Sequence, residues 1–128
     1  MEAWELYDGV IFRMLKKIER EEGFPENLSI IILSAKYGFI KPSDYISYYD
    51  HRLDSKTYMK PFLLNSLKKQ VECYHISKIF ICLGKDYLSA IEGFETIFSK
   101  KTQFLYATGG IGLKMSQLKK WIQTLKEE

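Results

Sequence analysis

Glycine and lysine follow three short apolar runs of this chain. The residues concerned are Ser34, Lys36, Tyr37 and Gly38 after the first run, Gly84 and Lys85 after the second, and Gly109, Gly110 and Gly112 after the third. A lysine can neutralise a bound anion, or move a proton if burial lowers its pKa, and a glycine loop before a helix exposes N–H groups that bind phosphate or carboxylate. The pattern favours an anion site. A tight turn also selects glycine, and neither common phosphate-loop pattern is matched.

The segment after the first run, residues 39–50, is long for a connection without helix or strand, and such loops are often functional. Asp50 is a candidate general base, or a group that orients a substrate hydroxyl. The alternative is that Asp50 hydrogen-bonds the backbone of its own loop. Tyr37 and Tyr49 are candidates to stack on a ring of a ligand. A hydrolase triad at Ser34 is not expected, because the G-x-S-x-G pattern is absent.

Length and composition favour one folded domain over residues 1–128. The chain is 46% hydrophobic and 27% charged, and its net charge of +3 permits a nucleic-acid partner without arguing for one. The two cysteines and two histidines lack metal-ligand spacing, so we expect neither a metal nor a cofactor. Because no apolar run reaches the roughly 20 residues of a membrane helix and no signal peptide is recognisable, we expect a cytoplasmic protein.

Helical and strand patterns alternate along the chain. Apolar spacing predicts helices over residues 2–22, from Ser55 or Thr57 to Tyr74, over 84–98 with an interruption at Gly93, and over 109–126, and strands over 29–35, 78–84 and 102–109. This order predicts an α/β fold: a three-layer, Rossmann-like sandwich with a small, mainly parallel sheet. The polar residues that follow the strands would then meet at one sheet edge, where such folds bind ligands. Three strands make a small sheet, so a fourth is either missing or supplied by a partner.

The stretch LSAKYGFIKPSDYISYYDHRL resembles a family of small bacterial and archaeal α/β proteins that carry LSAKYGLL, then a proline, then PYD. Phe39 and Ile40 replace the paired leucines here, and Tyr48 replaces the proline before Tyr49-Asp50. The GG-x-G segment before the last helix agrees as well. The arrangement is also similar to that of the YaaA-type peroxide-stress proteins, which bind DNA, and of a domain of archaeal tRNA 7-deazaguanine-modifying enzymes. The resemblance implies a nucleotide or nucleic-acid connection, and it implies that the family's first strand is missing.

Three hypotheses follow. In the first, a nucleotide or nucleobase derivative binds at the strand ends: Lys36, Lys85 and the 109–112 loop hold charge, Tyr37 and Tyr49 frame the ring, and Ser34 and Asp50 fix polar groups or move a proton. In the second, the lysines of the last helix, Lys114, Lys119, Lys120 and Lys126, contact nucleic-acid phosphates. In the third, the chain is a non-catalytic remnant that acts by oligomerisation, as a homodimer that completes its sheet. The sequence does not name a reaction.

Overall fold

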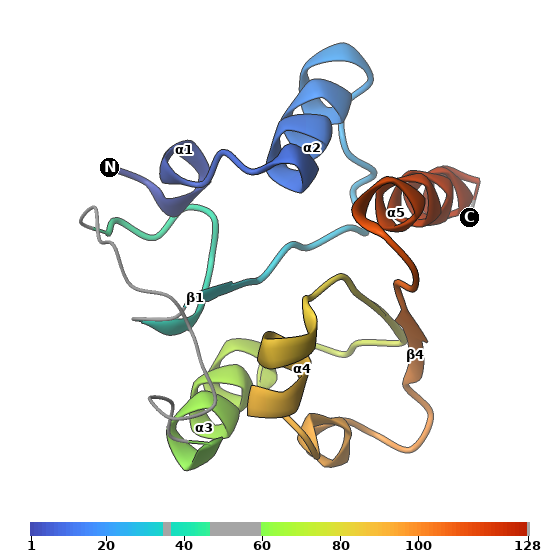
Figure 1. Cartoon of the computed structure of the whole chain (residues 1–128). Coiled ribbons are helices and arrows are strands. Elements are labelled where there is room, and N and C mark those ends of the chain that lie inside the picture. The colour runs from blue at the N-terminus through green and yellow to red at the C-terminus, as the bar shows by residue number, and fades with distance from the viewer. Residues whose placement is uncertain (35–36, 47–59, 128) are drawn as a thin grey trace.

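Two pairs of short strands lie among helices in the computed structural model, which describes residues 1–34, 37–46 and 60–127 (Figure 1). The elements in order are α1 (Ala3–Leu6), α2 (Val10–Glu21), β1 (Ile32–Ser34), β2 (Gly38–Ile40), α3 (Lys60–Val71), β3 (Lys78–Ile81), α4 (Lys85–Ala90), the 3-10 helix η1 (Phe94–Ile97), β4 (Gln103–Tyr106) and α5 (Ile111–Lys126). The predicted mixture of helix and strand is therefore confirmed.

The strands form two separate pairs in the described part of the chain. β3 and β4 are parallel, with Lys78 opposite Gln103 and Ile81 opposite Tyr106, as expected for strands joined by a helical crossover. β1 pairs instead with β2, antiparallel. No described strand joins these pairs into one sheet, so the three-layer, Rossmann-like sandwich stays a prediction.

The strand β2 lies where the sequence predicted a loop. It pairs back onto β1 with Ser34 opposite Gly38, which makes a tight hairpin. Gly38 has a φ of +76°, a conformation that other residues rarely adopt, and this allows the chain to reverse within a few residues. Because the apolar run Gly38–Ile40 has only three residues, its strand character depends on pairing with β1 rather than on its own pattern.

The single helix predicted over residues 2–22 is wrong at its N-terminal end. The chain leaves the helix at Tyr7, which is extended, and a new helix begins after Gly9, which is extended too. Glycine is less favourable than alanine inside a helix by about 1 kcal/mol, which favours a break at this position. The short α1 is then held by the segment after β2, because the Ala3 N–H donates to the Asp44 carbonyl at 2.7 Å.

The other helices follow the predicted apolar patterns. Leu63, Leu67 and Val71 of α3 are buried, as are Leu118, Ile122 and Leu125 of α5. The break predicted at Gly93 is confirmed, since this residue has a φ of +89° and separates α4 from η1. The helix ends predicted at Ser55 or Thr57 lie outside the described residues.

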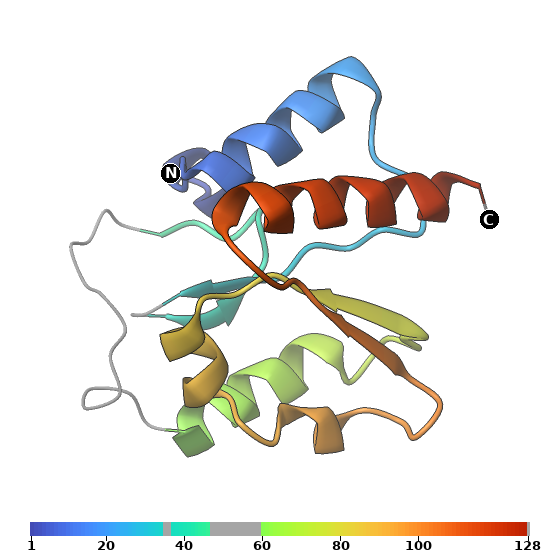
Figure 2. The ribbon, with the colours of Figure 1, turned by 45° about the vertical axis from the view of Figure 1, so that its right-hand side comes forward.

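Helices lie on both sides of the strands (Figure 2). α2 and α5 are on one side and share a buried cluster that contains Leu15, Ile18, Leu118 and Ile122. α3, α4 and η1 are on the other side, where a second cluster joins Leu33 of β1 and Ile81 of β3 to Leu67 and Phe94. The strands are thus positioned by apolar packing from both sides, which fixes where their ends point.

Candidate ligand site at the strand ends

The loops that follow β3 and β4 leave the strand pair side by side. Ile81 and Tyr106 are the last paired residues, and the Ala107 N–H extends the ladder by donating to the Ile81 carbonyl at 2.9 Å. Parallel register therefore brings residues 82–84 next to residues 107–110, as the sequence predicted for these two loops.

Lys114 of α5 reaches from one of these loops to the other. Its backbone N–H donates to the Gly110 carbonyl at 3.0 Å, and its ammonium donates to the Leu83 carbonyl at 3.3 Å. The side chain is half-buried rather than turned away from the protein. Sequence reasoning placed Lys114 with the solvent-facing lysines of the last helix. Its position in the first turn after a strand-end glycine loop was the feature that could have identified it.

Cys82 lies beside this lysine but is a poor nucleophile. Burial raises the pKa of the Cys82 thiol, and the positive charge of Lys114 has a smaller effect in the opposite direction. The reactive form of cysteine is the thiolate, which a raised pKa disfavours at neutral pH. The positive charge of Lys114 is therefore better suited to an external anion than to activating this thiol.

The glycines of these loops face open space. A Cβ added at Gly84, Gly110 or Gly112 would meet no atom within 4 Å. Gly110 precedes the first turn of α5 and carries no side chain that could cap it, so the first N–H groups of this 16-residue helix have no side-chain acceptor among the described residues. Uncapped N–H groups and the positive end of a helix dipole attract anions. Lys85 is exposed in the first position of α4, at the same edge.

Gly109 has a structural role instead. Its φ is +84°, and an added Cβ would come within 2.5 Å of the Leu113 side chain. Leu113 therefore folds back over this glycine. A larger residue would strain the left-handed backbone and displace the end of the exposed Leu113 side chain. Of the glycines predicted to bind a ligand here, Gly109 is the one that the fold itself requires.

Ser34, Tyr37 and Gly38 belong to the β1–β2 hairpin. Ser34 is fully buried, and its Oγ accepts a hydrogen bond from the Tyr37 N–H at 3.0 Å. Gly38 packs so closely on α3 that an added Cβ would lie 2.9 Å from the Ser66 Oγ and 3.2 Å from the Phe62 ring. These contacts give Ser34 and Gly38 a part in shaping the hairpin.

Three of the predicted site residues lie outside the described residues. They are Lys36, proposed to hold charge or transfer a proton, and Tyr49 and Asp50 of the long loop. Their roles remain predictions.

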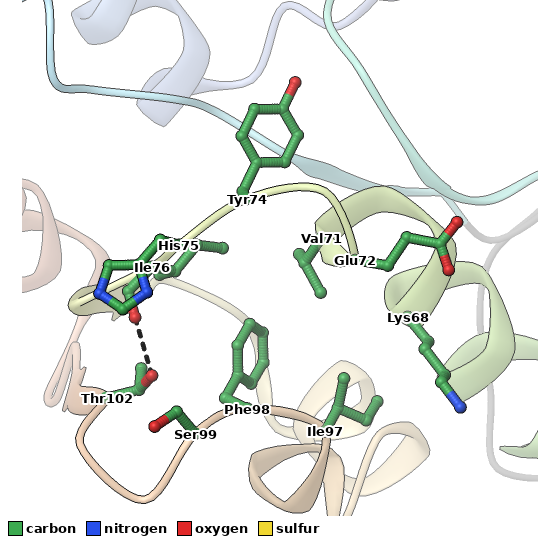
Figure 3. Close-up of a pocket in the computed structure, with 10 residues that line it drawn as sticks. All are labelled: Lys68, Val71, Glu72, Tyr74, His75, Ile76, Ile97, Phe98, Ser99 and Thr102. Atoms are coloured by element: carbon green, nitrogen blue, oxygen red, sulfur yellow. Dashed lines mark hydrogen bonds between the residues drawn. The ribbon is translucent and has the colours of Figure 1, made fainter.

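A pocket of about 220 Å³ lies at the opposite ends of the same strands, between the end of α3, the turn before β3 and the turn after η1 (Figure 3). Its apolar walls include Val71, Ile97 and Phe98. The Tyr74 ring and the Lys68 ammonium point away from the cavity in Figure 3. The Thr102 hydroxyl is already used, because it donates to the Ile76 carbonyl at 2.8 Å. No predicted site residue lines this pocket.

Two kinds of site are not found in the part of the chain that the structure describes. Among residues 1–34, 37–46 and 60–127, no cluster of three or more His, Cys, Asp or Glu side chains could hold a metal ion. No helix in these ranges has the length and apolar character needed to cross a membrane.

Comparison with known proteins places almost the whole chain in one family. The model of DUF6884, described as a family of unknown function, matches residues 1–123. No curated protein and no solved structure matches the chain.

Proposed function

We propose that this chain, which belongs to DUF6884, binds a small anionic ligand of nucleotide or nucleobase type at the ends of β3 and β4. The observation that carries the proposal is the position of Lys114, which lies in the first turn of α5 and whose ammonium donates to the Leu83 carbonyl at 3.3 Å. The proposal includes a Rossmann-like arrangement, and it is supported by the parallel β3–β4 pair with helices on both sides (Figure 2).

The anion would be bound by two kinds of group. Lys114 supplies a full positive charge, and the first N–H groups of α5 supply hydrogen-bond donors that need an acceptor. Hydrogen bonds to charged groups contribute about 1.5–3 kcal/mol each. A phosphate or carboxylate that contacted both the ammonium and these N–H groups would therefore bind tightly. The open space at Gly84, Gly110 and Gly112 leaves room for it.

The ring of the ligand would meet apolar surface beside the anion. Ile111 and Leu113 in the first turn of α5 are 53% and 56% exposed, so they present apolar surface next to these loops. Aliphatic side chains of this kind can cover one face of a flat heterocycle. Tyr37 and Tyr49, together with Lys36 and Asp50, remain proposed partners of the same ligand from the end of β1. Ser34 is fully buried, so its proposed role is indirect, through the Tyr37 N–H that its Oγ binds.

Thermal unfolding in the presence of AMP, adenosine and inorganic phosphate tests the proposal. A ligand at about 100 times its Kd stabilises a protein by about 2.7 kcal/mol, so saturating AMP should raise the Tm by several degrees. Adenosine and phosphate separate the contributions of ring and anion. If none of the three changes the Tm, the proposal is wrong.

A matched pair of variants locates the site. Lys114→Gln should weaken AMP binding by about tenfold or more, which corresponds to about 1.4 kcal/mol. Lys119→Gln, on the same helix but exposed, should bind as the unchanged protein does. Each variant is compared with and without ligand, so that a change in intrinsic stability is not mistaken for lost binding. Equal affinities in the two variants would place the ligand elsewhere.

Binding of nucleic acid by α5 has weaker support as an alternative. Lys126 forms a salt bridge with Glu22 at 3.2 Å, and the Lys114 ammonium donates to the Leu83 carbonyl. The other two lysines predicted to contact phosphates, Lys119 and Lys120, are exposed. A mobility shift that appears at low salt, weakens steeply with added salt and is lost in a Lys119→Gln, Lys120→Gln double variant would favour this alternative. The same double variant should leave AMP binding unchanged.

A further inference from the structure

One edge of β4 carries backbone groups that are not paired within the described part of the chain. The N–H groups of Gln103 and Ala107 donate to the carbonyls of Ser77 and Ile81, so the odd-numbered residues of this strand direct their backbone groups toward β3. Backbone groups alternate along a strand, and those of Phe104 and Tyr106 therefore point to the outer edge. No residue in the described ranges forms a hydrogen bond with them.

Both ends of this open edge are closed. At one end, the Gln117 side chain accepts from the Thr108 N–H at 3.0 Å and donates to the Thr108 carbonyl at 3.1 Å, as a neighbouring strand would. At the other end, the Thr102 N–H donates to the Ser99 carbonyl at 3.0 Å. The open edge is thus limited to Phe104, Leu105 and Tyr106, with two donors and two acceptors.

The side chains along this edge do not discourage pairing. Natural sheets protect open edges with lysine, proline or inward-pointing charges, and Gln103–Tyr106 contains none of these. Leu105 at its centre is 52% exposed. An exposed leucine in the middle of an unpaired edge is a surface suited to another strand.

We propose that a second copy of this chain pairs with β4 in antiparallel orientation, with the two-fold axis at Leu105. In this register Phe104 lies opposite Tyr106 of the partner subunit, and the pair exchanges two hydrogen bonds. Symmetry repeats the pair, so all four open backbone groups of each edge are satisfied. Leu105 meets Leu105 of the partner subunit on one face, and the two parallel pairs join into a four-stranded sheet.

The charges around β4 favour this orientation. Lys100 and Lys101 precede the strand, whereas Glu95 follows Phe94, whose ring lies 6.4 Å from the ring of Tyr106, the last residue of the strand. Antiparallel pairing brings the lysine end of one copy toward the glutamate end of the other, and parallel pairing would bring like charges together. The interface is also closed and symmetric, as in most soluble homodimers. A second copy therefore fits this edge.

Cysteine cross-linking tests the register. Residues opposite each other in a non-hydrogen-bonded antiparallel pair have Cα atoms about 4.5 Å apart, within the range that a disulfide spans. In a Cys73→Ser background, which removes the exposed native thiol, Leu105→Cys should form a covalent dimer on oxidation. Val10→Cys, 48% exposed on α2, is the matched control and should remain monomeric. No cross-link at position 105, or equal cross-linking of both variants, would overturn the proposal.

Light scattering tests the association without any cross-link. The mass of the unchanged protein should rise from one chain toward two as its concentration increases. Leu105→Lys should remain at the mass of one chain, because like charges opposite each other destabilise a strand pair. Tyr74→Lys, which changes an exposed aromatic residue in the turn before β3, should associate as the unchanged protein does. A monomer at every concentration, or dimerisation that survives Leu105→Lys, would overturn the proposal.

Discussion

Ser66 of α3 forms two hydrogen bonds with the backbone of Phe39 in β2. Its Oγ accepts from the Phe39 N–H at 2.8 Å and donates to the Phe39 carbonyl at 3.2 Å, and Gln70 donates to the same carbonyl at 3.2 Å. Helix side chains thus take the place of a neighbouring strand along β2. They hold the hairpin that contains Ser34 and Gly38 against α3.

We expect Ser66→Ala to lower the free energy of unfolding by about 1–3 kcal/mol, the usual cost of leaving a buried backbone group without a partner. The Phe39 N–H would lose its acceptor, while the carbonyl would keep Gln70. Urea denaturation followed by circular dichroism measures the change. Asn65→Ala, at the neighbouring exposed position of α3, is the control. Equal stability of the two variants would contradict a structural role for Ser66.

Gly38→Ala should destabilise the protein more than Gly23→Ala. Both glycines have a φ of +76°, so alanine is strained by about 1–2 kcal/mol at either position. Only at Gly38 would the new Cβ also approach the Ser66 Oγ to 2.9 Å, because Gly23 has no atom within 4 Å of that point. The difference between the two unfolding free energies measures the close approach of the hairpin to α3. A larger loss for Gly23→Ala would show that the hairpin is not packed as described.

The ionised form of Glu22 should stabilise the contact between the ends of α2 and α5. Hydrogen bonds from Gln123 and Lys126, and the charge of Lys126, lower the pKa of Glu22 below its usual value of 4.5. Because the folded pKa is the lower one, this stability is present above the unfolded pKa and is lost as the pH falls through the folded pKa. Glu22→Gln should therefore reduce the Tm at neutral pH and have no effect at a pH below the folded pKa. Glu21→Gln is the control, and an unchanged Tm at neutral pH in Glu22→Gln would contradict the prediction.

Tyr106 should ionise only in strongly alkaline solution. Burial, together with a hydrogen bond to the negatively charged Glu95, raises its pKa to about 12. A raised folded pKa contributes stability below the unfolded pKa of about 10, and this stability is lost as the pH rises toward 12. NMR of labelled tyrosine rings, assigned with Tyr106→Phe, measures the titration. Glu95→Gln should lower the Tyr106 pKa, and an unchanged value would show that Glu95 does not contact the hydroxyl.

Local patterns were sufficient to predict most elements of this protein. The runs that became β3, β4, α3 and α5 were identified by their apolar periodicity, and the break at Gly93 by glycine alone, because these features depend on neighbours a few residues away. The same patterns placed the glycines after β3 and β4 at one edge, since parallel strands end on the same side. The sequence also predicted that this edge should carry the candidate site.

The remaining features were decided by contacts between distant parts of the chain. β2 is a strand because it pairs with β1 and because Ser66, 27 positions after Phe39, hydrogen-bonds its other edge. The start of α1 is held by a carbonyl from a distant segment, that of Asp44, which accepts from the Ala3 N–H. Ser34 follows an apolar run as a surface serine would, yet tertiary packing buries it completely. Lys114 could be located on a helix from its sequence, but only the packing of α5 over β3 turned its ammonium to Leu83. The sequence determined the order and type of most elements through short-range periodicity, whereas the tertiary structure decided which polar groups meet, because hydrogen bonds and burial depend on distances that the order of residues does not contain.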